Sequence, residues 1–455
     1  MTYAHSEAAN PHWVPRAKLA DLEHIPGEIG PPVIGTTLRV LKDPPAYGKH
    51  MFQTYGKVFK INSFGNPGVV LVGAEANELM LFDRDKLFSS EQGWGPVLNL
   101  LFPRGLMLMD FEHHRLDRRA LGIAFKPEPM RAYAIDMNRI LADQIKQWKG
   151  DMLFQPAIKQ LTLDVAAHSF LGIPLDDEAD RINHAFVDMV QASIGAVRTP
   201  LPFTKMRKGV QGREYLIHYF GPQIEERRNN ENRQDMFSQF CRAKREDGEF
   251  MTDGELIDHI NFLMMAAHDT ITSSLTSMVW YLGQYPEWQD RLRDECLSIA
   301  PAGTDITQDM TADFILTEYF FKEVLRLASP VPSIPRRALR DFEFLGYKIP
   351  AGTGVSSSPG FVHTMEEYWE DPHKFDPMRH TPELTKARHR YAFVPFGGGA
   401  HMCLGLHFAY LQMKIFMHHL LTSRRIELEP GYAPKWQAWP MPLAKDGLQV
   451  RLAEL

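Results

Sequence analysis

The chain has few cysteines, only Cys241, Cys296 and Cys403 among 455 residues. An odd number of widely spaced cysteines suits neither a disulfide framework nor a zinc cluster. A reducing compartment is therefore favoured, and we expect a cytoplasmic protein.

The sequence also lacks a basic excess, because 50 lysines and arginines stand against 56 acidic residues, a net charge of −6. This balance gives no support to a nucleic-acid partner. No run of about 18 apolar residues occurs, and the polar segment Met1–Asn10 has no apolar signal core. We expect no membrane anchor.

The organisation favours one domain, because neither an internal repeat nor a linker is evident. We expect a polar segment over residues 1–24 and one folded domain over residues 25–455. Short strands are predicted in Gly56–Gly73, around a turn at Asn66–Gly68, and in Asp341–Pro350. Helical periodicity dominates the rest, so the predicted fold class is mainly α with small β-sheets.

One long helix is predicted from the capping box Thr252-Asp-Gly-Glu255 to Tyr285, before a proline. Its apolar middle is interrupted by His268, Asp269 and Thr270. These polar groups either serve a function or are satisfied locally, as when the Thr270 hydroxyl donates to the carbonyl four residues earlier.

Cys403 follows a glycine-rich loop, Phe396-Gly-Gly-Gly-Ala-His-Met-Cys-Leu-Gly405, and precedes a predicted helix. A helix N-terminus favours a thiolate, and the glycines allow the backbone to approach a flat ligand closely. Such a thiolate is either a nucleophile or an axial metal ligand.

The Cys403 loop resembles that of the cytochrome P450 superfamily of haem-thiolate monooxygenases. The resemblance implies a single-domain fold that holds haem b between the long helix and the helix after Cys403. It implies that Cys403 is the axial iron ligand, that Phe396 packs beside it and that His401 holds a haem propionate. A buried, unreactive cysteine is the alternative, but it explains none of the surrounding spacing.

Two further motifs fit the family. Glu323-Val-Leu-Arg326, with Arg379 upstream of the cysteine loop, resembles its structural network. A Glu and an Arg three apart are otherwise most often a surface pair. By the same resemblance, haem-propionate contacts are implied for three more residues: His114, Arg118 and Arg336, with Arg337 competing for the last role.

Ala266-Ala-His-Asp-Thr270 resembles the family's oxygen-activation motif. The resemblance implies that Ala266 lines the haem, and that Asp269 and Thr270 form the acid–alcohol pair that relays protons. Ala267 stands where the family usually has glycine, and its methyl group narrows the groove.

The resemblance also implies an electron donor, since the chain has no flavin or iron–sulfur domain. We expect a ferredoxin with its reductase, and a monomeric enzyme. Four basic residues are candidates for a docking face, although solvated side chains are the alternative for each: Arg115, Arg119, Lys126 and Lys414.

The expected substrate is a hydrophobic small molecule, because the predicted pocket walls are apolar. Terpenoids, retinoids, steroids and fatty acids all suit such walls, and the N-terminal segments look most like the retinoic-acid- and sterol-modifying branches. The candidate wall residues are Leu98, Leu100, Leu101, Phe102, Met264, Met265, Ile334 and Met441.

Two alternatives remain open. One is a peroxide-driven peroxygenase of the same fold, against which the Asp269–Thr270 pair argues. The other is a non-catalytic haem protein that senses or carries a ligand.

Overall fold

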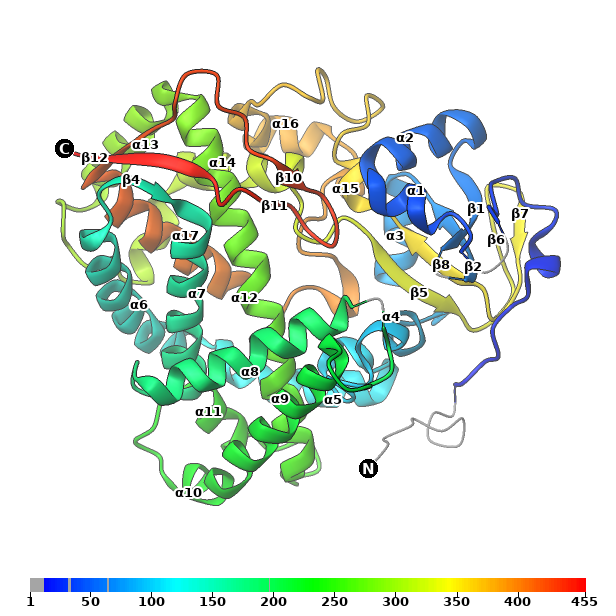
Figure 1. Cartoon of the computed structure of the whole chain (residues 1–455), viewed down its shortest axis with the longest axis horizontal. Coiled ribbons are helices and arrows are strands. Elements are labelled where there is room, and N and C mark those ends of the chain that lie inside the picture. Colours follow the sequence, from blue (N-terminus) through cyan, green and yellow to red (C-terminus); the bar gives the residue numbers. More distant parts are fainter. Residues whose placement is uncertain (1–11, 32–33, 64, 196) are drawn as a thin grey trace.

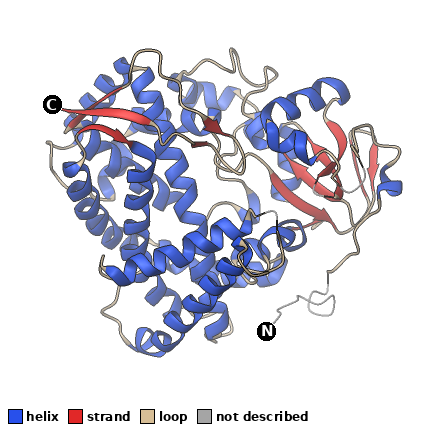
Figure 2. Cartoon of the chain, in the orientation of Figure 1, coloured by secondary structure: helices blue, strands red, loops and turns tan. Residues whose placement is uncertain are grey.

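The computed structural model describes residues 12–31, 34–63, 65–195 and 197–455. Helices form its larger part, and the largest sheet gathers on one side with the first three helices (Figure 1, Figure 2). The α-helices are α1 (Thr37–Lys42), α2 (Pro44–Tyr55), α3 (Ala74–Phe82), α4 (Ser90–Leu98), α5 (Phe111–Leu121), α6 (Pro127–Gln147), α7 (Phe154–Leu171), α8 (Asp177–Ser193), α9 (Lys205–Phe220), α10 (Ile224–Asn229), α11 (Met236–Arg242), α12 (Asp253–Gln284), α13 (Pro286–Ile299), α14 (Ile315–Leu327), α15 (Pro359–Val362), α16 (Pro382–Ala387) and α17 (Leu406–Leu421).

The strands form one five-stranded sheet, one three-stranded sheet and two hairpins within the described residues. The large sheet has the order β1-β2-β8-β5-β3, with β2 and β8 parallel and the other neighbours antiparallel. The small sheet is β4-β12-β9, and the hairpins are β6-β7 and β10-β11. The bounds are β1 (Val58–Ser63), β2 (Asn66–Leu71), β3 (Phe88–Ser89), β4 (Gly150–Leu153), β5 (Ile334–Ala338), β6 (Phe342–Phe344), β7 (Tyr347–Ile349), β8 (Gly354–Ser357), β9 (Arg424–Glu427), β10 (Trp436–Gln437), β11 (Leu443–Ala444) and β12 (Gln449–Glu454).

The long helix α12 runs through the middle of the helical part (Figure 1). The predicted capping box is confirmed, since the Glu255 amide donates to Thr252 Oγ1 at 3.4 Å and the Thr252 amide donates to Glu255 Oε2 at 2.8 Å. The stretches 256–262 and 271–279, on either side of its middle, are buried, and the Thr272 hydroxyl meets that of Thr162 on α7 at 2.7 Å. The helix is therefore a rigid element on which other segments pack.

The predicted turn at Asn66–Gly68 is wrong. Asn66 already pairs with Ser63, so β1 and β2 are joined at Gly65, where φ is +70°. The Asn-Pro-Gly sequence has turn chemistry, but β8 begins to pair with β2 at Gly68. Pairing in the sheet therefore overrides the local turn preference.

Candidate active site

The cysteine loop is fixed to its own backbone immediately before α17. The Cys403 amide donates to the Phe396 carbonyl at 2.9 Å, and the N-cap of α17 is Gly405. The Phe396 ring contacts that of Tyr410 on α17, with centroids 5.5 Å apart. Phe396 thus lies beside Cys403.

The glycines of this loop serve close packing against α3. Gly399 has φ of +61°, and a Cβ atom there would lie 2.1 Å from the Leu81 carbonyl oxygen. A Cβ atom on Gly398 would meet the Phe82 ring at 3.0 Å. These glycines therefore place the loop against the protein, whereas the sequence suggested an approach to a ligand.

Cys403 is the accessible cysteine of the three, since Cys241 and Cys296 are buried. Burial nevertheless raises the pKa of the Cys403 thiol, and the Gly405 amide and Arg118 offset this only in part. The Cys403 side chain therefore combines accessible surface with surroundings that disfavour its charge. Cys403 precedes Gly405, the N-cap of α17, and the Gly405 amide favours the thiolate as the sequence predicts, although desolvation outweighs it in this structure.

The middle of α12 has open surface although the helix crosses the core. Met265, Ala266, Ala267, Asp269 and Thr270 are partly exposed, whereas the residues that follow them are buried. The Thr270 hydroxyl donates to the Ala266 carbonyl at 2.9 Å. The local hydrogen bond considered from the sequence is thus present, and it leaves the oxygen lone pairs of Thr270 able to accept a proton donor.

Asp269 is held by its neighbour His268. Nδ1 of His268 lies 3.0 Å from Asp269 Oδ1, and His268 is buried with Nε2 unpartnered. Burial alone would raise the pKa of the Asp269 carboxyl, but the hydrogen bond and charge of His268 outweigh it and lower that pKa. The sequence marked His268 only as a polar interruption of the apolar middle of this helix, and its contact with Asp269 comes from the structure.

Four basic side chains converge near the cysteine loop. The rings of His114 on α5 and His401 lie 3.9 Å apart, and Nε2 of His114 is buried without a partner. Burial, Arg118 and Arg336 lower the pKa of His114 to about 4, while burial, His114, Arg336 and Arg118 lower that of His401. This mutual repulsion marks a place where an anionic ligand would be stabilised.

The arrangement separates Arg336 from its competitor on β5. Asp110 and Asp83 act on Arg336, and burial lowers its pKa to about 10. Arg337 is repelled instead by Arg16, near the N-terminal end of the described chain. Arg336 is therefore the member of the pair that belongs to the basic cluster.

The structure brings the Glu323 network together and adds a member. Arg326 Nε and Nη2 donate to the two Glu323 carboxylate oxygens at 2.8 Å, and both side chains are buried. Arg379 Nε lies 3.7 Å from Glu323, whereas His380 Nε2 is 3.0 Å from it and the Asp376 amide is 2.9 Å from it. His380 was missed because a histidine after Arg379 has no sequence signal of its own.

The candidate wall residues differ in how they are placed. Leu98, Leu101 and Phe102 are buried in the main core, as is Met264, and Ile334 is nearly buried on β5. Met265 packs partly exposed against this core, and Met441 is partly exposed. Leu100 is 36% exposed, and its place in the pocket wall stays a prediction.

The proposed basic docking face is largely neutralised by local partners. Arg115 Nη1 lies 2.8 Å from Glu246 Oε1, and Arg119 also pairs with Glu246. Lys414 is buried and donates to the Thr311 carbonyl at 2.8 Å and to Glu318 at 2.9 Å, so its prediction as a surface cation is wrong. Lys126 is exposed.

An ion triad centred on the buried Asp258, near the start of α12, was also missed. Asp258 accepts from Arg104 Nε at 2.5 Å and lies 2.6 Å from Arg213 Nη2 on α9. Asp258 has no exposed surface. The triad joins α12, α9 and the segment after α4, which lie far apart in the sequence.

Comparison with known proteins gives the family. A family model described as cytochrome P450 matches residues 25–442. The chain belongs to the cytochrome P450 family. A putative cytochrome P450 136 of Mycobacterium tuberculosis is 36% identical over 453 residues, which cover 96% of this chain and 91% of that protein.

Other members of the family are similar over most of their length. Abscisic acid 8'-hydroxylase 3 of Oryza sativa is 30% identical over 444 residues, which cover 94% of this chain and 86% of that protein. The structure of a cyanobacterial CYP120A1 with bound retinoic acid has a TM-score of 0.87 at 30% identity. It covers 95% of this chain and 99% of that one. The mainly helical fold with small sheets is therefore confirmed as a cytochrome P450 fold, and the chain is a monooxygenase of hydrophobic molecules.

Family membership implies a haem-thiolate cofactor, and the residues present fit one. The site offers one accessible thiol, and beside it a basic cluster with a buried nitrogen that has no partner. Among the described residues, no three His, Cys, Asp or Glu side chains could hold a metal ion by themselves. A metal held in a ring that also carries two carboxylates would need only a thiol from the chain. Its carboxylates would then meet the basic cluster.

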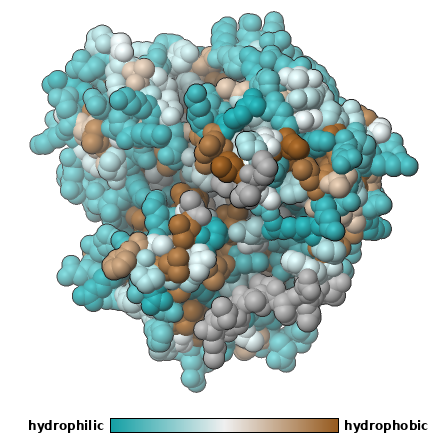
Figure 3. All heavy atoms as spheres, turned by 45° about the vertical axis from the view of Figure 1, so that its right-hand side comes forward, coloured by the Kyte–Doolittle hydropathy of each residue, from teal (hydrophilic) through white to brown (hydrophobic). Residues whose placement is uncertain are grey.

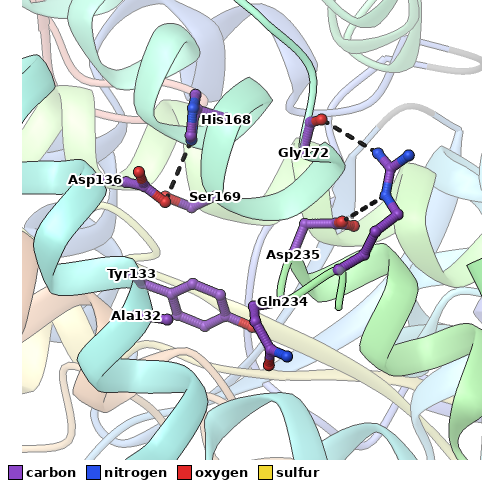
Figure 4. A pocket seen from close by; sticks show the side chains of 9 residues that line it. Ala132, Tyr133, Asp136, His168, Ser169, Gly172, Gln234 and Asp235 are labelled. Atoms are coloured by element: carbon purple, nitrogen blue, oxygen red, sulfur yellow. Dashed lines mark hydrogen bonds and ion pairs between the residues drawn. The ribbon is translucent and has the colours of Figure 1, made fainter. Parts of the chain in front are cut away.

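Two further observations concern parts of this cytochrome P450 outside the site. In the described part of the chain, no helix is long and apolar enough to cross a membrane. A separate recess of about 390 Å³ lies between α6, α7 and the segment before α11 (Figure 4). Its charged groups pair with each other, with His168 3.4 Å from Asp136 and Arg233 3.3 Å from Asp235. It contains none of the site residues.

Proposed function

We propose that this cytochrome P450 binds haem b through Cys403 and hydroxylates a C–H bond of an isoprenoid or related lipid. The carrying observation is the shielded yet accessible Cys403 thiol beside four convergent basic groups. Burial opposes ionisation of this thiol, so the positive charge of iron would hold it as the thiolate.

The bound haem supplies thiolate-ligated iron, which activates dioxygen for insertion of one oxygen atom into a C–H bond. His114, Arg118, Arg336 and His401 hold the haem propionates by charge-assisted hydrogen bonds. The two anions offset the repulsion that lowers the pKa of the histidines. Glu323 and Arg326 act at a distance, because their buried pair holds the segment before the cysteine loop.

Thr270 and Asp269 handle the protons. Thr270 Oγ1 donates to the Ala266 carbonyl, so its lone pairs point away from that bond and can accept a proton donor such as water. Asp269 passes protons inward, and the hydrogen bond from His268 keeps its carboxylate oriented and ionised between transfers. The methyl group of Ala267 narrows the groove beside them.

The substrate class is proposed from the walls and from the relatives. The candidate walls are apolar, with Met265 and Met441 partly exposed. Among the relatives, one is named for hydroxylation of abscisic acid and one structure holds retinoic acid. Both molecules are isoprenoid carboxylic acids. We therefore place terpenoids and retinoids before steroids and fatty acids.

Electrons are proposed to come from a separate ferredoxin and its reductase, with the enzyme acting as a cytoplasmic monomer. The exposed Lys126 remains available to an acidic partner. Arg115 and Arg119 become available only if the partner displaces Glu246 from them. A high ionic strength should therefore weaken the encounter.

The test is a screen of isoprenoid acids, sterols and fatty acids for a shift of the haem spin state, followed by turnover with a ferredoxin system. We expect a hydroxylated product. Thr270→Ala should keep haem binding and the spin shift, but should divert electrons to hydrogen peroxide. Unchanged coupling in this variant would contradict the proton role.

The same assay separates the two alternatives. Turnover with hydrogen peroxide as fast as turnover with ferredoxin would indicate a peroxygenase. Tight ligand binding without product under any electron donor would indicate a sensor or carrier.

A further inference from the structure

The recess between α6, α7 and the segment before α11 has buried hydroxyl groups without partners in its wall (Figure 4). Tyr133 on α6 and Ser169 on α7 both line it, and each of these side chains is buried. Within the described chain, neither Tyr133 Oη nor Ser169 Oγ has a hydrogen-bond partner. A buried hydroxyl group without a partner destabilises the folded state, so two of them in one wall indicate that something outside the chain satisfies them.

The recess is larger than these two hydroxyl groups need for water alone. Its volume is about 390 Å³, whereas one water molecule occupies roughly 30 Å³. Pockets that bind small molecules have volumes of about 300–1,000 Å³. The recess therefore has the volume of a small-molecule site, at the lower end of that range.

The side of the recess next to α11 is fixed by the chain itself. Gly172 ends α7 with φ of +62°, and a Cβ atom there would lie 2.6 Å from Asp235 Oδ2. The buried Arg227 donates to the Leu171 carbonyl at 2.8 Å and to Asp235 Oδ1 at 2.7 Å. The end of α7 and the segment before α11 are thus held together, and a ligand would lose little affinity to ordering them.

The charges in the recess are matched, which decides the charge of a ligand. Arg233 Nε lies 3.3 Å from Asp235 Oδ2, and its Nη2 donates to the Gly172 carbonyl at 3.2 Å. His168 Nδ1 lies 3.4 Å from Asp136 Oδ2. An anionic ligand would meet two carboxylates, and a cationic ligand would compete with Arg233 and His168 for them. A neutral ligand disturbs neither pair.

The lining is also too polar for a hydrophobic ligand. Among the side chains that line the recess, only that of Ala132 is purely apolar. Figure 3 shows, by contrast, a face of the molecule on which apolar side chains gather in patches. Burial and the charge of Asp235 raise the pKa of Tyr133, so its hydroxyl stays protonated and able to donate. A hydroxyl group of a ligand both donates and accepts, and so it can pair with Tyr133 and with Ser169 alike.

We propose that this recess binds a neutral, polyhydroxylated small molecule of the size of a monosaccharide. The hydroxyl groups of Tyr133 and Ser169 bond to those of the ligand inside the recess. Figure 4 shows Tyr133 extending from α6 toward Gln234, which is exposed and lies at the open side. The ligand would be an effector, because the recess contains none of the active-site residues.

Both walls of the recess lead to the start of α17, shortly after Cys403. The rings of Tyr133 and Phe408 have centroids 5.9 Å apart, and the ring of Phe170, next to Ser169, lies 4.8 Å from that of Phe408. Phe408 is buried in the first turn of α17. A ligand that holds Tyr133 and Ser169 together should therefore also steady the start of α17.

The test measures binding of glucose to the full haem-loaded protein by saturation-transfer-difference NMR, without substrate or electron donor. We expect saturable binding, and slower hydrogen exchange at the start of α17 when glucose is bound. Glucuronate and glucosamine, which add a negative or a positive charge to the same ring, should bind more weakly than glucose.

Three variants test the contacts. Tyr133→Phe and Ser169→Ala should each weaken binding about tenfold, because each removes one hydrogen bond to the ligand. Neither should lower the melting temperature, since the lost hydroxyl has no partner within the described chain. Ala132→Phe should abolish binding by filling the recess.

The matched control is Ser277→Ala. Ser277 on α12 is also buried, and its Oγ also has no partner among the described residues, but it does not line the recess. The control should bind glucose as the unaltered protein does. All variants should keep the haem spectrum, which shows that they fold.

Three results would overturn the proposal: no saturable binding of glucose, which leaves the recess to ordered water; full binding in both Tyr133→Phe and Ser169→Ala; or an equal loss of binding in Ser277→Ala. Glucuronate or glucosamine bound as tightly as glucose would contradict the neutral ligand, and unchanged exchange in α17 would contradict the link to the cysteine loop. The measurement uses no substrate, so it does not depend on the hydroxylation proposed above.

Discussion

At the scale of single residues, surroundings distinguish groups of the same chemical type. Burial raises the pKa of both Cys241 and Cys296 to about 12, which keeps these thiols neutral and unreactive. Burial also raises the pKa of the Cys403 thiol, yet this side chain has accessible surface and Arg118 nearby. A cysteine in a sequence is therefore a candidate, and its access and neighbours decide what it can bind.

Replacing His268 tests the support of Asp269. In His268→Leu the pKa of the Asp269 carboxyl should rise, because the hydrogen bond that offsets burial is lost. The acid limb of the pH–rate profile should then move to higher pH, and more peroxide should form. His268→Asn, whose amide can donate from the position of Nδ1, should restore both.

Equal pH–rate profiles for His268→Leu and His268→Asn would show that the His268 side chain only fills space. Infrared measurement of the Asp269 carboxyl in the haem-free protein gives a readout independent of turnover.

The buried His419 should make the folded protein less stable in mild acid. It is buried, and its pKa is lowered to about 4 by burial and by His418. The unfolded chain, with a histidine pKa near 6.5, then binds the proton more readily than the folded chain. The free energy of unfolding should fall as pH drops from 6.5 toward 4, by about 1.4 kcal/mol per pH unit for this group.

The matching variant is His419→Gln, which can keep the bond to Asn138 Oδ1, 3.0 Å from His419 Nε2 in the wild type. Urea unfolding of both proteins at several pH values measures the effect. A slope that is the same in both proteins would rule out His419 as its source.

At the scale of elements, α12 combines separate tasks along one helix. Its capping box fixes the start, Asp258 in the second turn holds Arg104 and Arg213, and the open middle carries Asp269 and Thr270. The capping box keeps the open middle in register. The Asp258 contacts tie α9 and the segment after α4 to the same rigid element.

Asp258→Asn should therefore loosen two segments at once. Two arginines would lose a buried partner, which costs about 3–5 kcal/mol of unfolding free energy for a buried pair. Hydrogen exchange should rise in α9 and in the segment after α4, but not in α6. The control Asp151→Asn, from an exposed pair with Arg451 at 3.9 Å, should cost about 0–1 kcal/mol.

An equal cost in the two variants would contradict the triad's role, and so would exchange that rises uniformly over the molecule.

The local elements and the cysteine loop were predictable from the sequence, whereas contacts between distant segments were not. The capping box of α12 and the glycines before Cys403 depend on neighbours in the chain. The burial of Lys414 depends on residues about 100 positions away, and the Asp258 triad depends on Arg104, 154 positions away, and on Arg213 from another helix. The turn at Asn66 failed for the same reason, since β8 lies far along the sequence.

At the scale of the whole molecule, the fold brings three unrelated stretches to one site. The helix α5 contributes His114 and Arg118, the strand β5 contributes Arg336, and the loop before α17 contributes Cys403 and His401. The helix α5 is itself fixed to α12, because His259 lies 3.0 Å from Asp117. The repulsion among the four basic groups is the energetic cost of preparing a site for two carboxylates.

The central claim is that Cys403 supplies a thiolate to haem iron, and the spectrum of the reduced carbon-monoxide complex tests it most directly. The haem-loaded wild type should show the strongly red-shifted Soret band of thiolate ligation, and Cys403→Ser should lose it. Cys241→Ser and Cys296→Ser should keep it. An unshifted band in the wild type, or a shifted band that survives in Cys403→Ser, would contradict the account.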